Sequence, residues 1–282
     1  MTERIDFIFK DETIHLTQSA GFFSCCSVRL DAIIQYYKRY GKLPSKVDST
    51  QQYRLYKLPG QENTDITREF FLDPEDVSVE IRETPNYREN FQGLNYRAQI
   101  NYAPILPFVQ KYFSPNAEIM DAVAHFEQKY DIDYNNTCVL FYRGLDKVTE
   151  FPLPTYRDVF ARARKIANKH SGSKLRFLIQ SDEADFIDAA LVEFPGAIVF
   201  RDETRALPRQ NTSVDLFYRD KLEHRDKLEN FYYAKLFFAI VLIMGRARYF
   251  VCNTGNISIW TCFYRGGADE NVHQYLNWGY CN

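Results

Sequence analysis

Short apolar runs alternate with stretches of helical spacing along the second half of the chain. The apolar runs lie at residues 138–142, 175–180, 197–200 and 249–252. Runs that are mostly apolar, rather than apolar at every second position, are typical of parallel strands covered by helices on both faces. Helices are predicted between and after these runs, at residues 155–169, 186–194, 231–245 and 257–265. The alternation predicts an α/β fold built on a parallel sheet.

The first half opens with one unit of the same kind. Residues 13–18 alternate like a strand, and residues 19–24 form a turn. Residues 26–40 then carry apolar side chains at helical spacing, and Gly41 stops the helix. Residues 46–50 follow as a second strand. The order of these elements predicts a βαβ unit with a small-residue loop at the ligand edge of its sheet.

The remainder of the first half combines an aperiodic segment with two helices. Residues 73–102 are polar and are predicted to form loops, and prolines confine a helix to the later part of 103–113. A further helix ends near residue 130, with Ser114 as its N-cap and Pro115 at its first position.

The length of 282 residues suits two domains. The polar segment 131–137 is the predicted boundary, which gives an N-terminal domain of residues 1–130 and a C-terminal domain of residues 131–282. The last residues could pack back on the N-terminal half. Together, the patterns predict two Rossmann-like halves that face each other across a cleft.

Composition narrows the class of protein. The formal net charge is −2 and the pI is about 6.2. Proteins that bind nucleic acid usually carry a basic surface, so this class is not expected. The His residues show no metal-binding spacing, and the longest apolar run, 236–244, is too short to span a bilayer.

The six cysteines form no CxxC pair, and Cys138 and Cys252 lie inside apolar runs. Buried free thiols in a reducing compartment explain this pattern better than disulfides do. Since the N-terminus also has no apolar signal region, we expect a cytoplasmic protein. The sequence predicts no oligomeric state.

Polar residues follow three of the predicted parallel strands. Arg143, Gly144, Asp146 and Lys147 come after the first, Ser181 and Asp182 after the second, and Thr254, Gly255 and Asn256 after the fourth. In open α/β sheets, ligands bind beyond the carboxyl ends of the strands. The simpler alternative is that these residues form polar turns and helix caps.

A nucleotide diphosphate fits all three strand ends. Arg143 and Lys147 are suited to phosphates, and a turn at residues 254–256 that opens a helix offers backbone N–H groups to an anion. Asp182 is suited to nucleoside hydroxyls or a base amino group. The chain has neither the phosphate-binding loop of P-loop proteins nor the glycine fingerprint of dinucleotide-binding proteins. Phosphate charge would then be neutralised by side chains and a helix N-terminus, with no metal or other cofactor.

The order of Arg143, Asp146-Lys147, Asp182 and Asn253-Thr-Gly-Asn256 resembles the donor-binding half of the fucosyltransferase superfamily. The resemblance covers about residues 138–265. It implies a GT-B fold and an inverting, metal-independent glycosyltransferase. It also implies that Arg143 stabilises the departing diphosphate, that Asp182 contacts the nucleoside and that Gly255 and Asn256 bind phosphate.

Two positions depart from the family's pattern, since Phe141 replaces a His and Gly144 replaces a second Arg. The sequence from Asn253 onward also looks like a group of bacterial and large-virus proteins that includes capsid-glycan xylosyltransferases. The donor is therefore expected to be either UDP-xylose or GDP-fucose, and the acceptor a glycan hydroxyl. In a virus, the enzyme would work in the host cytoplasm.

The N-terminal half is expected to supply the general base that inverting transfer requires. Asp48 is the first candidate, Asp73 the second and Asp65 the third; the alternative for Asp48 is an Asx-turn. Gly21 and Phe22, in the loop after the first strand, are expected to contact the donor. Outside this class, a non-catalytic nucleotide-sugar-binding protein and a phosphate-ester-processing enzyme remain the alternatives.

Overall fold

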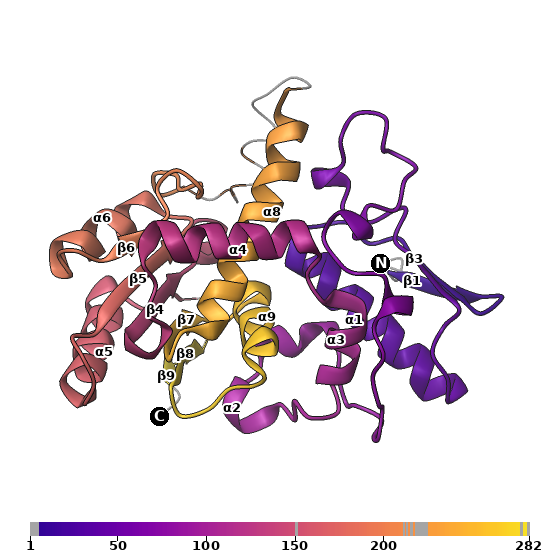
Figure 1. Ribbon diagram of the computed structural model, residues 1–282, viewed down its shortest axis with the longest axis horizontal. Coiled ribbons are helices and arrows are strands. Elements are labelled where there is room, and N and C mark those ends of the chain that lie inside the picture. The colour runs from indigo at the N-terminus through magenta and orange to yellow at the C-terminus, as the bar shows by residue number, and fades with distance from the viewer. Residues whose placement is uncertain are drawn as a thin grey trace. The chain divides into compact units, whose positions relative to one another are not determined.

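The computed structural model describes residues 6–149, 152–210, 212, 214, 217, 225–276 and 279–280. The chain divides into two compact units. Unit 1 consists of Met1–Phe91, Asn101–Met120 and Lys221–Lys235, and unit 2 of Gln92–Ile100, Asp121–Asp220 and Leu236–Asn282. Each unit is thus assembled from segments that lie on both sides of residue 130. Figure 1 labels the helices and strands of both units.

Unit 1 contains a three-stranded sheet in the order β1-β2-β3. Its strands are β1 (Phe7–Lys10), β2 (Thr13–Leu16) and β3 (Lys46–Asp48). β2 and β3 are parallel and are joined through α1 (Phe22–Tyr40), so the predicted βαβ unit is confirmed. β1, which the sequence did not predict, pairs antiparallel with β2.

Helix α1 begins four residues earlier than expected, with Gly21 as its N-cap. Its first helical bond runs from the Cys25 N–H to the Gly21 carbonyl. The early start buries the ring of Phe22, whose centroid lies 4.7 Å from that of Phe70 and 5.4 Å from that of Tyr53. This aromatic cluster forms part of the unit 1 core.

Short helices lie within the predicted loop segment 73–102, namely η3 (Pro74–Asp76), η4 (Glu89–Gly93) and α2 (Tyr96–Gln99), and two more precede it, η1 (Arg54–Tyr56) and η2 (Thr67–Glu69). Helix α3 spans Leu106–Phe113, which matches the expectation. Helix α4 spans Ala117–Tyr130, and the prediction of Ser114 as its N-cap was wrong. The Asn116 side chain accepts the Ile119 N–H, whereas the Ser114 hydroxyl donates to the Gln110 carbonyl at the end of α3.

Unit 2 contains a six-stranded sheet in the order β6-β5-β4-β7-β8-β9. The strands are β4 (Thr137–Tyr142), β5 (Arg176–Ser181), β6 (Ile198–Val199), β7 (Tyr249–Asn253), β8 (Val272–Leu276) and β9 (Gly279–Tyr280). All neighbours are parallel except β8 and β9. The four predicted strands are confirmed, and β8 and β9 are additional. The predicted α/β class with a parallel sheet is therefore correct.

The helices of this unit are α5 (Tyr156–Lys169), α6 (Ala184–Glu193) and α9 (Asn256–Arg265), with η5 (Tyr134–Asn136) and η6 (Asp146–Thr149). Helix α8 (Arg225–Arg246) contributes residues 236–246 to unit 2 and residues 225–235 to unit 1. α5 and α6 bury apolar side chains against β4 and β5, and Figure 1 shows both helices beside this part of the sheet. Buried Cys138, Tyr142 and Phe186 belong to this core. The sheet order places β4 next to β7, where the direction of chain connection reverses.

Candidate functional site

Arg143, the first residue after β4, holds the carboxyl ends of β4 and β5 together. Its Nε donates to Asp182 Oδ2 at 2.6 Å, and its Nη2 donates to Asp146 Oδ1 at 2.8 Å. A guanidinium has five N–H groups, and these two bonds use two of them. The side chain remains 20% exposed. The structure thus brings Arg143, Asp146 and Asp182 together, three residues singled out from the sequence.

Backbone bonds extend this cluster to β7. The Gly144 N–H donates to Asp182 Oδ1 at 2.9 Å, so both oxygens of Asp182 are engaged. The Arg143 N–H donates to Asn253 Oδ1, and Asn253 Nδ2 donates back to the Arg143 carbonyl, at 3.2 and 3.3 Å. The ends of β5, β4 and β7 are therefore joined at the point where the strand order reverses, the usual ligand site of such sheets.

The pKa values of Arg143 and Asp146 are both shifted toward the charged form. Burial lowers the pKa of Arg143, but the carboxylates of Asp182 and Asp146 outweigh it and raise that pKa above its ordinary value. Burial raises the pKa of Asp146, but Arg143 and Lys147 outweigh it and hold the pKa low. Lys147 lies in η6, within the same loop. At neutral pH the site therefore presents fixed positive groups beside fixed negative ones.

The turn after β7 is anchored by partners from distant segments. The Thr254 hydroxyl donates to the Tyr275 carbonyl at 2.8 Å. Gly255 is the N-cap of α9 with φ of 156°, and its N–H donates to the Tyr96 hydroxyl at 2.9 Å. Asn256 is the first residue of α9. The Gly255 N–H, expected to serve a phosphate, thus has a partner within the chain.

Gln274 on β8 supports the same turn and was missed by the sequence reasoning. Its Oε1 accepts the Tyr96 N–H at 2.9 Å, and its Nε2 donates to the Leu94 carbonyl at 2.9 Å and to the Thr254 hydroxyl at 3.4 Å. Gln274 is 5% exposed. A glutamine in the segment Val-His-Gln-Tyr-Leu gives little local signal of such a role.

Ser181, the last residue of β5, and Glu183, the N-cap of α6, both have hydrogen-bond partners within unit 2. The Ser181 hydroxyl accepts the Glu183 N–H at 3.0 Å, a local turn bond; the alternative that Ser181 or Asp182 caps α6 was wrong, because the N-cap is Glu183 and no side chain caps this helix. Glu183 itself is fully buried, and its Oε1 accepts the Tyr156 hydroxyl at 2.6 Å. Arg209 Nε lies 3.5 Å from the same oxygen. Burial raises the pKa of Glu183, although Tyr156 and Arg209 oppose the shift.

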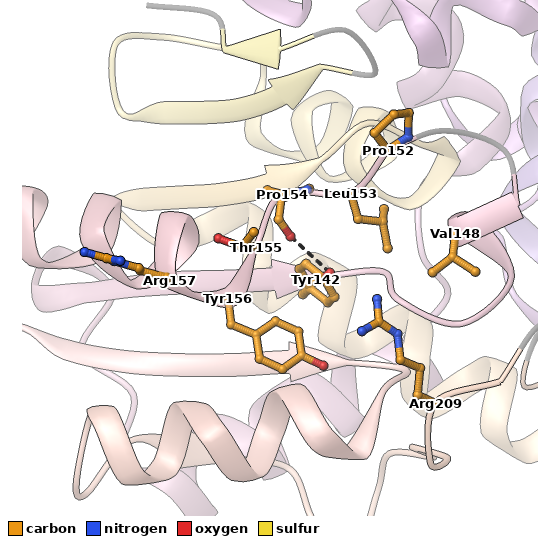
Figure 2. Close-up of a pocket in the computed structure, with 9 residues that line it drawn as sticks. All are labelled: Tyr142, Val148, Pro152, Leu153, Pro154, Thr155, Tyr156, Arg157 and Arg209. Atoms are coloured by element: carbon orange, nitrogen blue, oxygen red, sulfur yellow. Dashed lines mark hydrogen bonds between the residues drawn. The ribbon is translucent and has the colours of Figure 1, made fainter.

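A pocket of about 470 Å³ lies next to this arrangement in unit 2. Figure 2 shows its lining residues, which are Tyr142, Val148, Pro152, Leu153, Pro154, Thr155, Tyr156, Arg157 and Arg209. The guanidinium of Arg209 points toward the Tyr142 ring, whereas Arg157 points away from it. The Tyr142 hydroxyl donates to the Pro154 carbonyl at 3.2 Å and fixes the loop that follows β4.

In unit 1, Asp48 ends β3 and contacts His15 on β2. Its Oδ2 lies 3.0 Å from His15 Nδ1, and its Oδ1 accepts the Thr50 N–H at 3.0 Å, which forms the Asx-turn considered as the alternative. Burial raises the pKa of Asp48, but the bonds from Thr50 and His15 outweigh it and the pKa is lowered. His15 was not singled out in the sequence.

The carboxylates of Asp73 and Asp65, the other candidates of unit 1, also have partners within the chain. Asp73 caps η3 by accepting the Glu75 N–H at 2.9 Å, and it forms an ion pair with Arg68. Asp65 accepts the Ser49 N–H as well as the N–H and hydroxyl of Thr67.

Gly21 and Phe22 serve the start of α1. The Phe22 N–H donates to the Tyr56 hydroxyl at 2.8 Å, and its ring is only 6% exposed. Packing therefore accounts for the Phe22 ring, and Gly21 is the N-cap next to it.

Within the described part of the chain, no group of three or more His, Cys, Asp or Glu side chains is arranged to hold a metal ion. The same residues contain no helix that is long and apolar enough to cross a membrane. Cys25, Cys26, Cys138, Cys252 and Cys262 are buried free thiols, as expected, and Cys281 lies outside the described residues.

The parallel sheet of unit 2, with its strand order reversing between β4 and β7, defines a Rossmann-type architecture. No protein-family model and no curated protein sequence matches the chain. Solved structures do. NodZ α-1,6-fucosyltransferase soaked with GDP-fucose aligns with 94% of this chain and 95% of its own, with a TM-score of 0.57 and 10% identity.

Two further structures of the same enzyme agree. NodZ co-crystallised with GDP gives a TM-score of 0.54 at 11% identity over 95% of this chain and 96% of its own. Fucosyltransferase NodZ from Bradyrhizobium gives 0.52 at 12% identity, again over 95% and 96%. At such identities the likeness establishes the fold, which is GT-B-like as predicted.

Proposed function

We propose that this protein is a glycosyltransferase that moves a sugar from a nucleotide-diphosphate donor to a glycan hydroxyl. The observation that carries the proposal is the Arg143 cluster at the reversal of strand order, where Arg143 bonds Asp182 and Asp146 and its backbone meets Asn253. The likeness to a fucosyltransferase solved with GDP-fucose and with GDP supports it.

In this proposal, Arg143 stabilises the negative charge that develops on the departing diphosphate. Asp182 and Asp146 fix the guanidinium in one orientation, so little reorganisation is needed when the charge appears. Lys147 adds a second positive charge, and the N-terminus of α9 at Asn256 adds the positive end of a helix dipole. With these groups available, we propose inverting transfer without a metal ion or other cofactor.

UDP-xylose and GDP-fucose are the two donors that we propose. Phe141 is buried and stacks on Phe250, with ring centroids 6.3 Å apart, where the fucosyltransferase pattern has a His. This substitution favours UDP-xylose. The resemblance to large-virus xylosyltransferases supports the same donor, together with a capsid-glycan acceptor. The buried thiols support a cytoplasmic location.

The acceptor hydroxyl also needs a general base. Asp48 and Asp73 are the candidates that we retain. Asp48 is favoured because its carboxylate contacts His15, a group that can accept and pass on a proton. Asp73 is already held by Arg68 and by the cap of η3.

The test is transfer of labelled sugar from UDP-xylose and GDP-fucose to glycan acceptors, with thermal shift by UDP, GDP and ADP measured in parallel. We expect stabilisation by the cognate nucleotide and transfer that Arg143→Ala slows strongly. Arg164→Ala is the matched control, because Arg164 pairs with Glu193 on the helix surface. Stabilisation without sugar loss to acceptor or water would favour a non-catalytic binding protein, and release of phosphate would favour a phosphate-ester enzyme. No stabilisation by any nucleotide would contradict the proposal.

A further inference from the structure

Asp182 and Glu183 are consecutive acids after β5, and each contacts a different arginine. Asp182 bonds Arg143 in the cluster proposed to meet the diphosphate. Glu183 lies beside Arg209, whose guanidinium reaches into the 470 Å³ pocket. The pocket is also continuous with the Arg143 loop in sequence, because Tyr142 and Val148 line it and flank residues 143–147. The pocket and the cluster are therefore neighbours built on the same strand ends.

Glu183 organises one wall of this pocket from within the core. It is fully buried, and one oxygen contacts both the Tyr156 hydroxyl and Arg209 Nε. Its other oxygen, Oε2, is buried without a hydrogen-bond partner. Burying a carboxylate in this way is costly unless its partners compensate. The arrangement fixes Tyr156 and Arg209, whose side chain stays 56% exposed, toward the pocket.

The shape and chemistry of the pocket suit a flat ring with carbonyl acceptors. Pro152, Leu153 and Pro154 provide apolar walls, and Tyr156 provides a ring. Nucleobases stack on aromatic rings and on guanidinium planes. Arginine N–H groups pair with ring carbonyls such as guanine O6, whereas adenine presents an amino group at that position. The volume falls within the range of small-molecule sites, which is about 300–1,000 Å³.

We propose that this pocket binds the nucleobase of the donor and that Arg209 selects a base with ring carbonyls, uracil or guanine, over adenine. The inference rests on the proposed function, since it assigns the nucleoside of the same donor. The diphosphate then extends from the pocket to Arg143, in keeping with ligands that run along the carboxyl edge of such sheets. Arg209 is a binding residue in this assignment, and Glu183 positions it.

The experiment measures the Kd of UDP, GDP, ADP and inorganic pyrophosphate by calorimetry for the full chain, Arg209→Ala and the control Arg164→Ala. We expect the wild type to prefer UDP or GDP over ADP. Arg209→Ala should weaken the preferred nucleotide about tenfold, reduce the preference over ADP and leave pyrophosphate unchanged. Arg164→Ala should change none of these values. A melting temperature for each variant verifies folding, and the exposure of Arg209 makes its replacement compatible with the fold.

Three results would overturn the inference. Equal losses for pyrophosphate and nucleotide in Arg209→Ala would make Arg209 a phosphate ligand, and unchanged nucleotide affinity would remove it from the site. Both results leave the proposed glycosyl transfer standing. If the wild type binds neither nucleotides nor pyrophosphate, the proposed function fails together with the inference. Tyr156→Phe provides a second variant, because it removes the hydroxyl that bonds Glu183 and should weaken the preferred nucleotide without affecting pyrophosphate.

Discussion

The carboxylate of Glu183 lies directly against Gly144. A Cβ atom built on Gly144 would stand 1.6 Å from Glu183 Oε2 and 2.9 Å from Glu183 Cβ. Gly144 does not have a positive φ, so its backbone conformation does not call for glycine. The close approach of Glu183 does, because it leaves no room for a side chain. The space beside Gly144 is therefore occupied by the side chain of Glu183, which follows the neighbouring strand β5.

Replacing Gly144 by alanine should destabilise unit 2. The new methyl group must displace a buried carboxylate, and overpacking of this kind costs about 1–3 kcal/mol or more. Gly93→Ala is the control, because nothing lies within 4 Å of a Cβ at that position. Thermal or urea unfolding measures both variants. Equal stability of Gly144→Ala and wild type would show that Glu183 moves aside freely, and the double variant with Glu183→Ala should recover part of the loss.

Removing Arg143 should affect activity more than stability. The Arg143→Ala variant leaves Asp182 and Asp146 without their shared cation, so some loss of stability accompanies it. The rate of sugar transfer should fall about 100- to 1,000-fold, as for other groups that stabilise developing charge. Arg143→Lys should rescue little, since one ammonium cannot hold both carboxylates in the same geometry. Initial rates at saturating donor test this, and an active Arg143→Ala enzyme would exclude the assigned role.

The acid stability of the chain should depend on Glu183. Since its pKa is raised in the fold, its protonated form stabilises the folded chain. This contribution is present below the unfolded pKa of about 4.3 and is lost as the pH rises through the folded pKa. Glu183→Gln keeps an acceptor for Tyr156 without the charge, so its melting temperature should fall less than that of wild type as the pH rises from about 4 to 7.

Asp146 provides the comparison with opposite sign. Its lowered pKa means that the ionised form of Asp146 stabilises the folded chain. This contribution to stability is lost as the pH falls below about 4, through the pKa of Asp146 in the folded state. Asp146→Asn should therefore flatten the acid side of the stability profile only. Identical pH profiles for wild type and both variants would contradict the two assignments.

The choice of general base is open to a direct test. Asn at position 48 still accepts the Thr50 N–H, so Asp48→Asn should fold normally, bind nucleotide and lose most transfer activity. Asp73→Asn keeps the cap of η3 and loses the charge paired with Arg68, so a small change in rate is expected. The reverse ranking of the two rates would make Asp73 the better candidate.

The turn before α9 should depend on Gln274. Gln274→Ala removes bonds to Tyr96 and Leu94 and leaves buried groups unpaired, which costs about 1–3 kcal/mol. Nucleotide affinity should also weaken, because Thr254 loses a bond from Gln274 and Tyr96, which holds Gly255, loses its bond to the same side chain. Glu270→Ala, at an exposed position before the same strand, is the control. Unchanged stability and affinity would show that the turn holds its shape without β8.

The parallel core of unit 2 could be predicted because β4, β5 and β7 are mostly apolar, a pattern that can be recognised in the local sequence alone. The Arg143 and Asp182 strand ends could be predicted for the same reason, since a charged residue directly after a buried strand stands out. β8 was missed because Val-His-Gln-Tyr-Leu mixes polar and apolar residues.

Contacts between distant segments were beyond the reach of such patterns. Asn253 meets Arg143 from 110 residues away, and Gln274 meets Leu94 from 180. The prediction of the N-cap of α4 was wrong for a different reason. Ser114 has a suitable side chain, but its hydroxyl donates to the Gln110 carbonyl at the end of α3.

The anchoring of the β7–α9 turn also fixes when it can form in a growing chain. Tyr96 leaves the ribosome 159 residues before Gly255, and Thr254 leaves it 21 residues before Tyr275. At about 5–20 residues per second, the Tyr96 hydroxyl waits roughly 8–30 s for its partner. Until β8 emerges, the polar groups of this turn that are buried in the folded protein stay exposed in the nascent chain. Chaperones can bind the incomplete unit 2 during this interval.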